Sequence, residues 1–303
     1  MGLAQIAFGR IMVMVVLMLV GGVCAKTGII DEAANKRLSN FLLLVVSPTV
    51  IFMSYQRDFD PALLAGLLKA LLLSAVSFVI SLGAAHGFYR SRNGKDRSIE
   101  RFAVVYSNAG FLGIPLIQGV FGTEGVFYLT AYLTMFQLLT WTHGVIIMSG
   151  TFTPSQLKGL ARSPALIGVC AGFLFFLLGV ALPPFLAEPL ELVGSMNTPL
   201  AMVVAGVSIS SANLGHILKN RRIYRLALFR MIAVPGSILA VVGAFGFPPV
   251  ITGVVVTAAA CPVAANLILF AYRYDKDALY ASEIFAFSTV ASLVTIPILL
   301  LFL

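Results

Sequence analysis

Two short runs, far apart in the chain, combine proline, asparagine and small residues within apolar stretches. They are Asn108-Ala-Gly-Phe-Leu-Gly-Ile-Pro115 and Cys261-Pro262-Val-Ala-Ala-Asn266. Proline lacks a backbone donor and clashes with the preceding turn, so each run predicts a broken or kinked helix. A helix that restarts after a break presents unpaired N–H groups and about half a positive elementary charge. Two such starts lying together would suit a carboxylate, and the two asparagines could add amide donors.

Other roles for these residues remain open at the level of sequence. A proline can produce a simple kink, and an asparagine inside a membrane helix can cap broken backbone instead of binding a ligand. We expect the second halves of the two helices to begin near Pro115 and Pro262, with Gly113 beside the first. Gln137 and Ser288 could line the same path or could bridge helices.

Two charged residues lie inside other apolar stretches. Glu283 lies about one turn into the last stretch, and Arg230 a similar way into an earlier one from the same side. Charges within a membrane pair or serve function. We expect a structural Arg230–Glu283 ion pair, with proton coupling through Glu283 as the alternative. His86 and His143 have no metal partner at ligand spacing, so the sequence predicts no metal site and no cofactor.

The elements that position these residues are apolar from end to end. Hydrophobic residues make up 59% of the 303 residues and charged residues 11%, against about 25% charged in soluble domains. Stretches long enough to cross about 30 Å of hydrocarbon recur throughout. Barrel strands would alternate polar and apolar residues, so we predict an all-α integral membrane protein with a single membrane domain, 1–303. The ten expected spans are 4–24, 38–55, 62–87, 101–120, 126–149, 164–182, 190–212, 223–246, 250–271 and 279–303.

The basic residues predict the orientation of these spans. Most of the 20 Lys and Arg residues lie in or beside the loops that follow the odd-numbered spans, whereas the other loops hold only Arg57. Because cytoplasmic loops are enriched in Lys and Arg, we expect both termini outside the bacterial inner membrane. The net charge of +8 follows from this bias and does not indicate binding to nucleic acid.

Similar features recur in the same order in the two halves of the chain. Ser47-Pro48 corresponds to Asn197-Thr198-Pro199, the two proline and asparagine runs correspond, and the fifth and tenth spans place aromatic and hydroxyl residues alike. An odd number of spans per half gives the halves opposite orientations. We therefore predict two inverted five-helix repeats.

Several of these residues form motifs that resemble a known family. The stretch Ser107–Leu116, followed by Phe121-Gly-Thr-Glu-Gly125 and Trp141, resembles the auxin efflux carrier family in its bacterial branch. The run Lys26–Asp31, Pro199, and Pro262 with Asn266 fit as well. The likeness extends from the first span to the C-terminus.

The resemblance implies a fold and a mode of action. The fold is similar to that of bile-acid/sodium symporters, with the fourth and ninth helices broken and crossing at their prolines. A scaffold would comprise about 4–55 and 164–212, and a transport unit about 62–149 and 223–303. Family members move organic acids by an elevator-like motion, often as dimers. The central loop, 150–163, is shorter than in plant members, so regulation by phosphorylation of a long loop is not expected.

The sequence thus predicts a secondary transporter or facilitative carrier of small organic anions, a homodimer in lipid. The alternative is a symporter of larger amphipathic acids, coupled to a sodium ion or a proton. An enzyme is not expected, because no Asp lies inside a span and no His-Glu-x-x-His motif is present. A receptor or channel would not explain two matched helix breaks.

Overall fold

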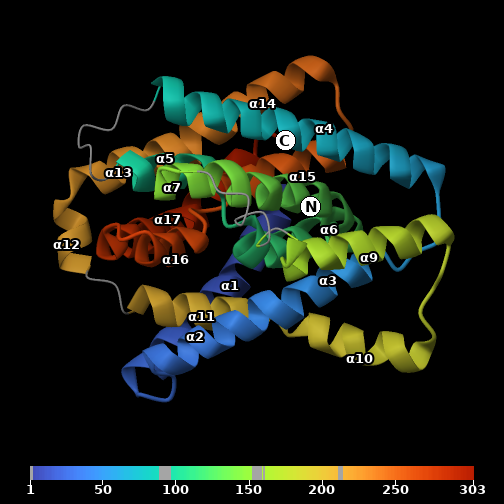
Figure 1. The fold of residues 1–303 in the computed structure, drawn as a ribbon, viewed down its shortest axis with the longest axis horizontal. Helices are drawn as coiled ribbons and strands as arrows, with labels where there is room; N and C mark the ends of the chain where they lie inside the picture. Colours follow the sequence, from blue (N-terminus) through green and yellow to red (C-terminus); the bar gives the residue numbers. More distant parts are fainter. Residues whose placement is uncertain (1–2, 89–96, 152–158, 160, 211–213) are drawn as a thin grey trace.

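The computed structural model describes residues 3–88, 97–151, 159, 161–210 and 214–303. Within these residues the chain is helical and contains no strand, so the predicted all-α class is confirmed. Figure 1 shows α2, α3, α10 and α11 along one side of the molecule and α4 and α14 along the other.

The described part of the first half is a succession of helices, and segments labelled η are π-helical. They are α1 (Leu3–Lys26), α2 (Glu32–Phe41), η1 (Leu42–Val46), α3 (Ser47–Ser54), α4 (Pro61–Gly83), η2 (Ala84–Phe88), α5 (Arg97–Val105), η3 (Ala109–Gly113), α6 (Ile114–Leu139), η4 (Thr140–Gly144) and α7 (Val145–Ser149).

The second half has the same character. Its helices are α9 (Pro164–Leu178), α10 (Pro184–Ser195), α11 (Asn197–Ser210), α12 (Leu214–Lys219), α13 (Arg221–Leu228), η6 (Phe229–Ala233), α14 (Val234–Phe245), α15 (Pro249–Ala260), α16 (Asn266–Arg273) and α17 (Ala278–Leu300).

Seven helical runs in the described residues are long and apolar enough to cross a membrane. They are Phe8–Lys26, Glu32–Ser54, Pro61–Gly87, Ala109–Ser149, Pro184–Ser210, Arg221–Gly243 and Ala278–Leu300. The longest contains Gly122, whose φ of 68° and ψ of −160° are not helical. A residue with a side chain rarely adopts this conformation, so glycine permits the chain to bend between two helical segments within α6.

Proline explains three of the π-helical segments. Pro48, Pro115 and Pro235 each follow such a segment closely, at the start of the next α-helix. The proline ring clashes with the carbonyl four residues earlier, which in each case lies inside the π-helical segment. A wider turn relieves this clash without ending the helix. The sequence therefore contains the cause of these irregularities.

Glycines allow two pairs of helices to pack with their backbones in contact. A Cβ atom added to Gly21 of α1 or Gly206 of α11 would collide with the backbone of the facing helix. Gly168 of α9 packs in the same way against the backbone of Pro48 in α3. Small residues are typical of helix interfaces in membranes, because van der Waals packing there replaces the hydrophobic effect.

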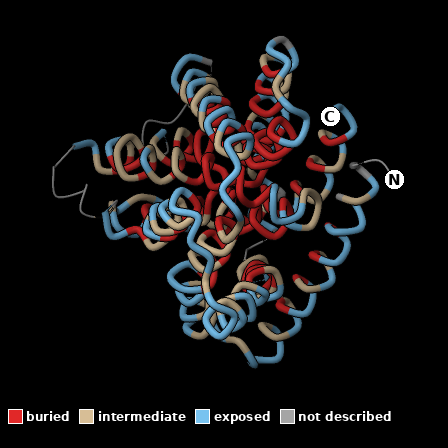
Figure 2. The backbone as a smooth tube through the Cα atoms, turned by 90° about the vertical axis from the view of Figure 1, so that its right-hand side faces the viewer, coloured by how far each residue is buried: buried red, intermediate tan, exposed pale blue. Residues whose placement is uncertain are grey.

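Large apolar side chains are exposed over much of the outer surface of the described helices. Figure 2 shows buried residues concentrated in the centre of the molecule, with exposed positions on the outer helices. Phe8, Leu19 and Val23 on α1 and Leu72 and Val79 on α4 are among many large apolar side chains left exposed. Such a surface indicates contact with lipid and supports a multi-pass membrane protein.

Candidate functional site

Two helix breaks face each other in the middle of the structure. Residues 106–108 separate α5 from η3, and residues 261–265 separate α15 from α16. The Asn108 N–H donates to the Pro262 carbonyl at 2.7 Å, and the Ala264 N–H donates to the Tyr106 carbonyl at 3.0 Å. The two breaks, which we call the crossover, thus satisfy each other's backbone groups where lipid could not.

The helices restart at different residues from those predicted. The first restart is at Ala109, ahead of Pro115, and the second is at Asn266, after Pro262. Pro115 is accommodated by the π-helical turn of η3, so it does not end a helix. Pro262 lies within the non-helical segment, where the missing N–H removes no helical hydrogen bond. The α-helix α6 begins at Ile114, beside Pro115 as expected, but the π-helical η3 precedes it, and α16 begins only at Asn266.

A cavity of about 410 Å³, which we call the crossover cavity, lies beside the two breaks. Asn108, Asn266 and Gln137 line it together, so three predicted site residues meet there. Ser47 of α3 lines the same cavity, and its charged lining residue, Arg162, is exposed to solvent. The volume suits a small organic molecule.

Asn108 offers an unused donor at this cavity. The residue is 5% exposed, and its side-chain Nδ2 has no hydrogen-bond partner among the described residues. The side chain makes no capping bond to η3, although Asn108 stands at its N-terminus. A buried donor without a partner costs about 1–3 kcal/mol. A bound acceptor would recover this energy, which favours the ligand role of Asn108 over the capping role.

The other predicted site residues are not among those that line this cavity. Gly113 packs against Cys261, since an added Cβ atom would lie 3.3 Å from its Sγ. The Ser288 hydroxyl accepts a hydrogen bond from the Val263 N–H at 3.1 Å. Pro115 lines a different cavity, of about 380 Å³, together with Arg10.

Glu283 and Arg230 do not form the predicted ion pair. The Glu283 carboxylate instead contacts the imidazole of His216, with Oε1 and Nδ1 2.5 Å apart. The Arg230 guanidinium donates to the carbonyl of Cys261 at the crossover, at 3.4 Å.

The positions of the two residues along their helices explain why the predicted ion pair does not form. Arg230 lies about 14 Å along the helix from Arg221, whereas Glu283 lies only about 8 Å from Ala278. Arg230 therefore reaches the depth of the helix breaks, and Glu283 remains near the end of its helix. The prediction placed both residues at a similar depth.

Sequence reasoning also missed a contact between two histidines. The Nε2 atoms of His86 and His143 lie 2.9 Å apart, and the Tyr106 hydroxyl lies 2.9 Å from Nδ1 of His143. These residues come from η2, η4 and the crossover, so no local spacing in the sequence indicates their contact. Among the described residues, no three His, Cys, Asp or Glu side chains are placed to hold a metal ion.

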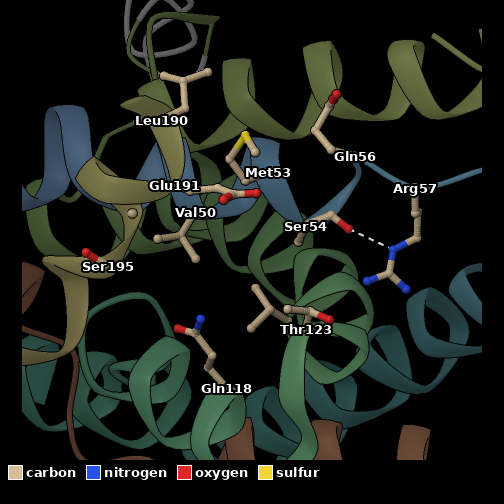
Figure 3. Close-up of a pocket in the computed structure, with 12 residues that line it drawn as sticks. Val50, Met53, Ser54, Gln56, Arg57, Gln118, Thr123, Leu190, Glu191 and Ser195 are labelled. Atoms are coloured by element: carbon tan, nitrogen blue, oxygen red, sulfur yellow. Dashed lines mark hydrogen bonds between the residues drawn. The ribbon is translucent and has the colours of Figure 1, made fainter. Parts of the chain in front are cut away.

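A second cavity, of about 350 Å³, lies at the other end of α3 (Figure 3). Gln118 and Glu191 line it from different helices, and the Arg57 Nε donates to the Ser54 carbonyl at 3.0 Å. Burial lowers the pKa of Arg57, and the Glu124 carboxylate opposes this effect. Arginine nonetheless keeps its charge at neutral pH. The structure thus has one cavity toward each end of α3.

Comparisons with known proteins agree on one family. A family model described as "Membrane transport protein" matches residues 6–156 and 150–300. An uncharacterized transporter of Methanothermobacter thermautotrophicus is 25% identical over 291 residues, covering 93% of this chain and 94% of the relative. An uncharacterized transporter of Methanocaldococcus jannaschii is 26% identical over 298 residues, covering 94% and 95%.

Proposed function

Because the chain belongs to the membrane transport protein family, the family of the auxin efflux carriers, we propose that it carries small organic anions across the membrane. The observation that supports this function best is the crossover cavity, with its unpaired Asn108 amide. A cavity of this size suits a carboxylate attached to a small organic body.

Helix starts supply the positive potential for such an anion. η3 begins directly after Asn108, and α16 begins at Asn266, so both starts border the crossover cavity. Each start contributes about half a positive elementary charge. The amides of Asn108, Asn266 and Gln137 add neutral donors, and Arg162 attracts anions to the entrance.

The architecture we propose has ten spans in two inverted repeats. Gly122 divides the longest of the seven apolar runs into two spans, and the shorter apolar helices α9 and α15 are counted as the remaining two. The glycine contacts support it. Under this symmetry the contact of α1 with α11 corresponds to that of α9 with α3, and both contain glycine against backbone. The broken helices correspond in the same way.

Movement of the crossover would carry the ligand between the two cavities. In the proposed elevator mechanism, α1–α3 and α9–α11 form a fixed scaffold, and the other helices move with the crossover. Polar contacts between the described residues of these two groups are few, such as Tyr55 with Thr130 at 2.5 Å and Arg10 with the Gly119 carbonyl at 3.1 Å. A sliding interface with few polar contacts is compatible with repeated movement.

The basic loops predict the side that each cavity faces. We expect Asp58 to lie outside the cell and Lys276 to lie in the cytoplasm, so that the crossover cavity opens inward. A cysteine introduced at position 58 should react with an impermeant maleimide in intact cells, whereas one at position 276 should react only after lysis. The reverse pattern would contradict the orientation.

Counterflow in proteoliposomes tests the proposed function. Vesicles loaded with an unlabelled monocarboxylate should accumulate the labelled acid transiently if the protein is a carrier, whereas a channel, receptor or enzyme gives no such exchange. A panel of mono- and dicarboxylates is needed to find the substrate. Folded protein that exchanges no acid of the panel would contradict the proposal.

Gly110 offers a matched pair of variants for this assay. It lines the crossover cavity, and an added Cβ atom would lie 3.8 Å from its nearest neighbour, Leu133. Gly110→Ala should therefore retain exchange, whereas the ring in Gly110→Phe should fill the cavity and abolish it. Equal exchange by both variants would place the ligand elsewhere.

A further inference from the structure

Arg230 is the largest fully buried side chain in the described part of the protein, with 1% of its surface exposed. Its Nη2 atom makes one long hydrogen bond, to the Cys261 carbonyl, and its Nε and Nη1 atoms have no partner in the described residues. A permanent charge in such a place is strongly unfavourable unless other charges compensate for it.

Carboxylates on the neighbouring helices do not provide this compensation. η6, which carries Arg230, packs against α5 and α17, and these helices contain the buried residues Glu100 and Glu283. Glu100 accepts a hydrogen bond from the Tyr280 hydroxyl at 2.9 Å, and Glu283 contacts His216. Within the described residues, Arg230 forms no ion pair.

The negative end of one helix lies beside Arg230, and a second helix ends at the same crossover. α5 ends at Val105 and α15 ends at Ala260, so both end at the crossover, and η6 packs against both helices. Each end carries about half a negative elementary charge, so the two ends together match the single positive charge of the guanidinium. The bond to Cys261, the residue that follows α15, fits this arrangement.

Polar side chains also lie at the crossover itself. The hydroxyls of Tyr132 and Ser107 lie 2.9 Å apart. Ser107 belongs to the crossover and directly precedes Asn108. Arg230 contacts the Cys261 carbonyl of the crossover and is not among the residues that line the crossover cavity, so it lies behind the backbone that would hold the ligand.

We propose that Arg230 is a built-in cation, which occupies the place at the helix ends where transporters with broken helices bind a coupling cation. In such transporters, C-terminal ends of half-helices and unwound carbonyls coordinate sodium or a proton. Here a tethered guanidinium neutralises those groups permanently. The carrier therefore needs no sodium to bind its anion. This inference rests on the proposed function and specifies its ion requirement.

Cation dependence tests this role in two steps. For the wild-type protein, substrate affinity and thermal stability should be the same in sodium chloride and in choline chloride. For Arg230→Ala, we expect affinity to fall at least about tenfold and the melting temperature to drop, because the helix ends lose their counter-charge. Millimolar ethylguanidinium should restore part of both quantities in this variant and should leave the wild type unchanged.

Further variants separate charge from packing. Arg230→Lys should keep most of the affinity, whereas Arg230→Met, which preserves the volume without the charge, should lose it. Lys69→Ala removes an exposed cation from α4 and should respond to neither salt nor ethylguanidinium. If Arg230→Ala does not fold, the comparison of the Lys and Met variants decides the question.

Three results would overturn the role of Arg230: sodium-dependent affinity in the wild type, unchanged affinity in Arg230→Met, or failure of ethylguanidinium to act on a folded Arg230→Ala protein. The melting temperature with ethylguanidinium requires no transported substrate. If the counterflow assay contradicts the proposed function, the melting temperature still tests the role of Arg230 independently.

Discussion

Replacing Asn108 by alanine should weaken carboxylate binding by about 10- to 150-fold, because a hydrogen bond to a charged group contributes about 1.5–3 kcal/mol. The side chain lines the crossover cavity, and its Nδ2 donor has no partner in the described structure. Its removal therefore breaks no internal hydrogen bond of that donor, and the fold should persist. Substrate-induced thermal stabilisation and uptake measure the loss.

Asn266→Ala should have an effect of similar size, since Asn266 lines the same cavity from the other broken helix. Asn35→Ala is the matched control. The Asn35 amide donates to the Ser208 hydroxyl at 3.0 Å between α2 and α11, away from the cavity. This control should change stability without changing affinity. Unchanged uptake in both cavity variants would assign Asn108 and Asn266 a purely structural role.

The sequence predicted that both helices are interrupted, because each run combines a proline with small residues. The position of the first break, residues 106–108, was not predicted, since this segment contains no proline. Glycine permits the separate bend at Gly122. The family resemblance, which depends on the same motif, is confirmed by the comparisons. The meeting of Asn108 and Asn266 at one cavity follows from the pairing of the breaks.

The partners of buried charges could not be predicted in this way. Arg230 and Glu283 lie on different helices, and the sequence does not show which face of each helix points toward the other or toward the crossover. His216, the observed partner of Glu283, lies on the short helix α12, outside the predicted spans. The sequence therefore did not indicate it as a partner for a residue within the membrane. The contact of His86 with His143 likewise depends on how separate helices pack. Sequence periodicity describes one helix at a time, whereas these contacts depend on relative depth and rotation.

The positive potential of the crossover comes from the helix starts and from Arg230, and the positions of these two sources predict which ligands bind. Helix starts and amides face the cavity, whereas Arg230 lies behind the crossover and is committed to the helix ends. The charged side chain that lines the cavity is Arg162, which is exposed at its edge. Under the proposed function, a first carboxylate would bind at the helix starts, and a second one would meet only Arg162 or water.

The first carboxylate of a ligand should accordingly increase its affinity strongly, and a second carboxylate should add little. An ester or amide of the preferred acid should bind about tenfold more weakly or worse, because the helix starts stabilise a charge that the neutral analogue lacks. Tricarboxylates should bind more weakly than monoanionic acids, since their additional charges would have to lose water without a partner.

Competition of matched acid, ester and tricarboxylate against a labelled substrate measures both effects. Arg162→Gln is the internal control, because it should weaken dicarboxylates more than monocarboxylates. Equal binding of acid and ester would refute the role of the helix starts, even if counterflow had already established a carrier.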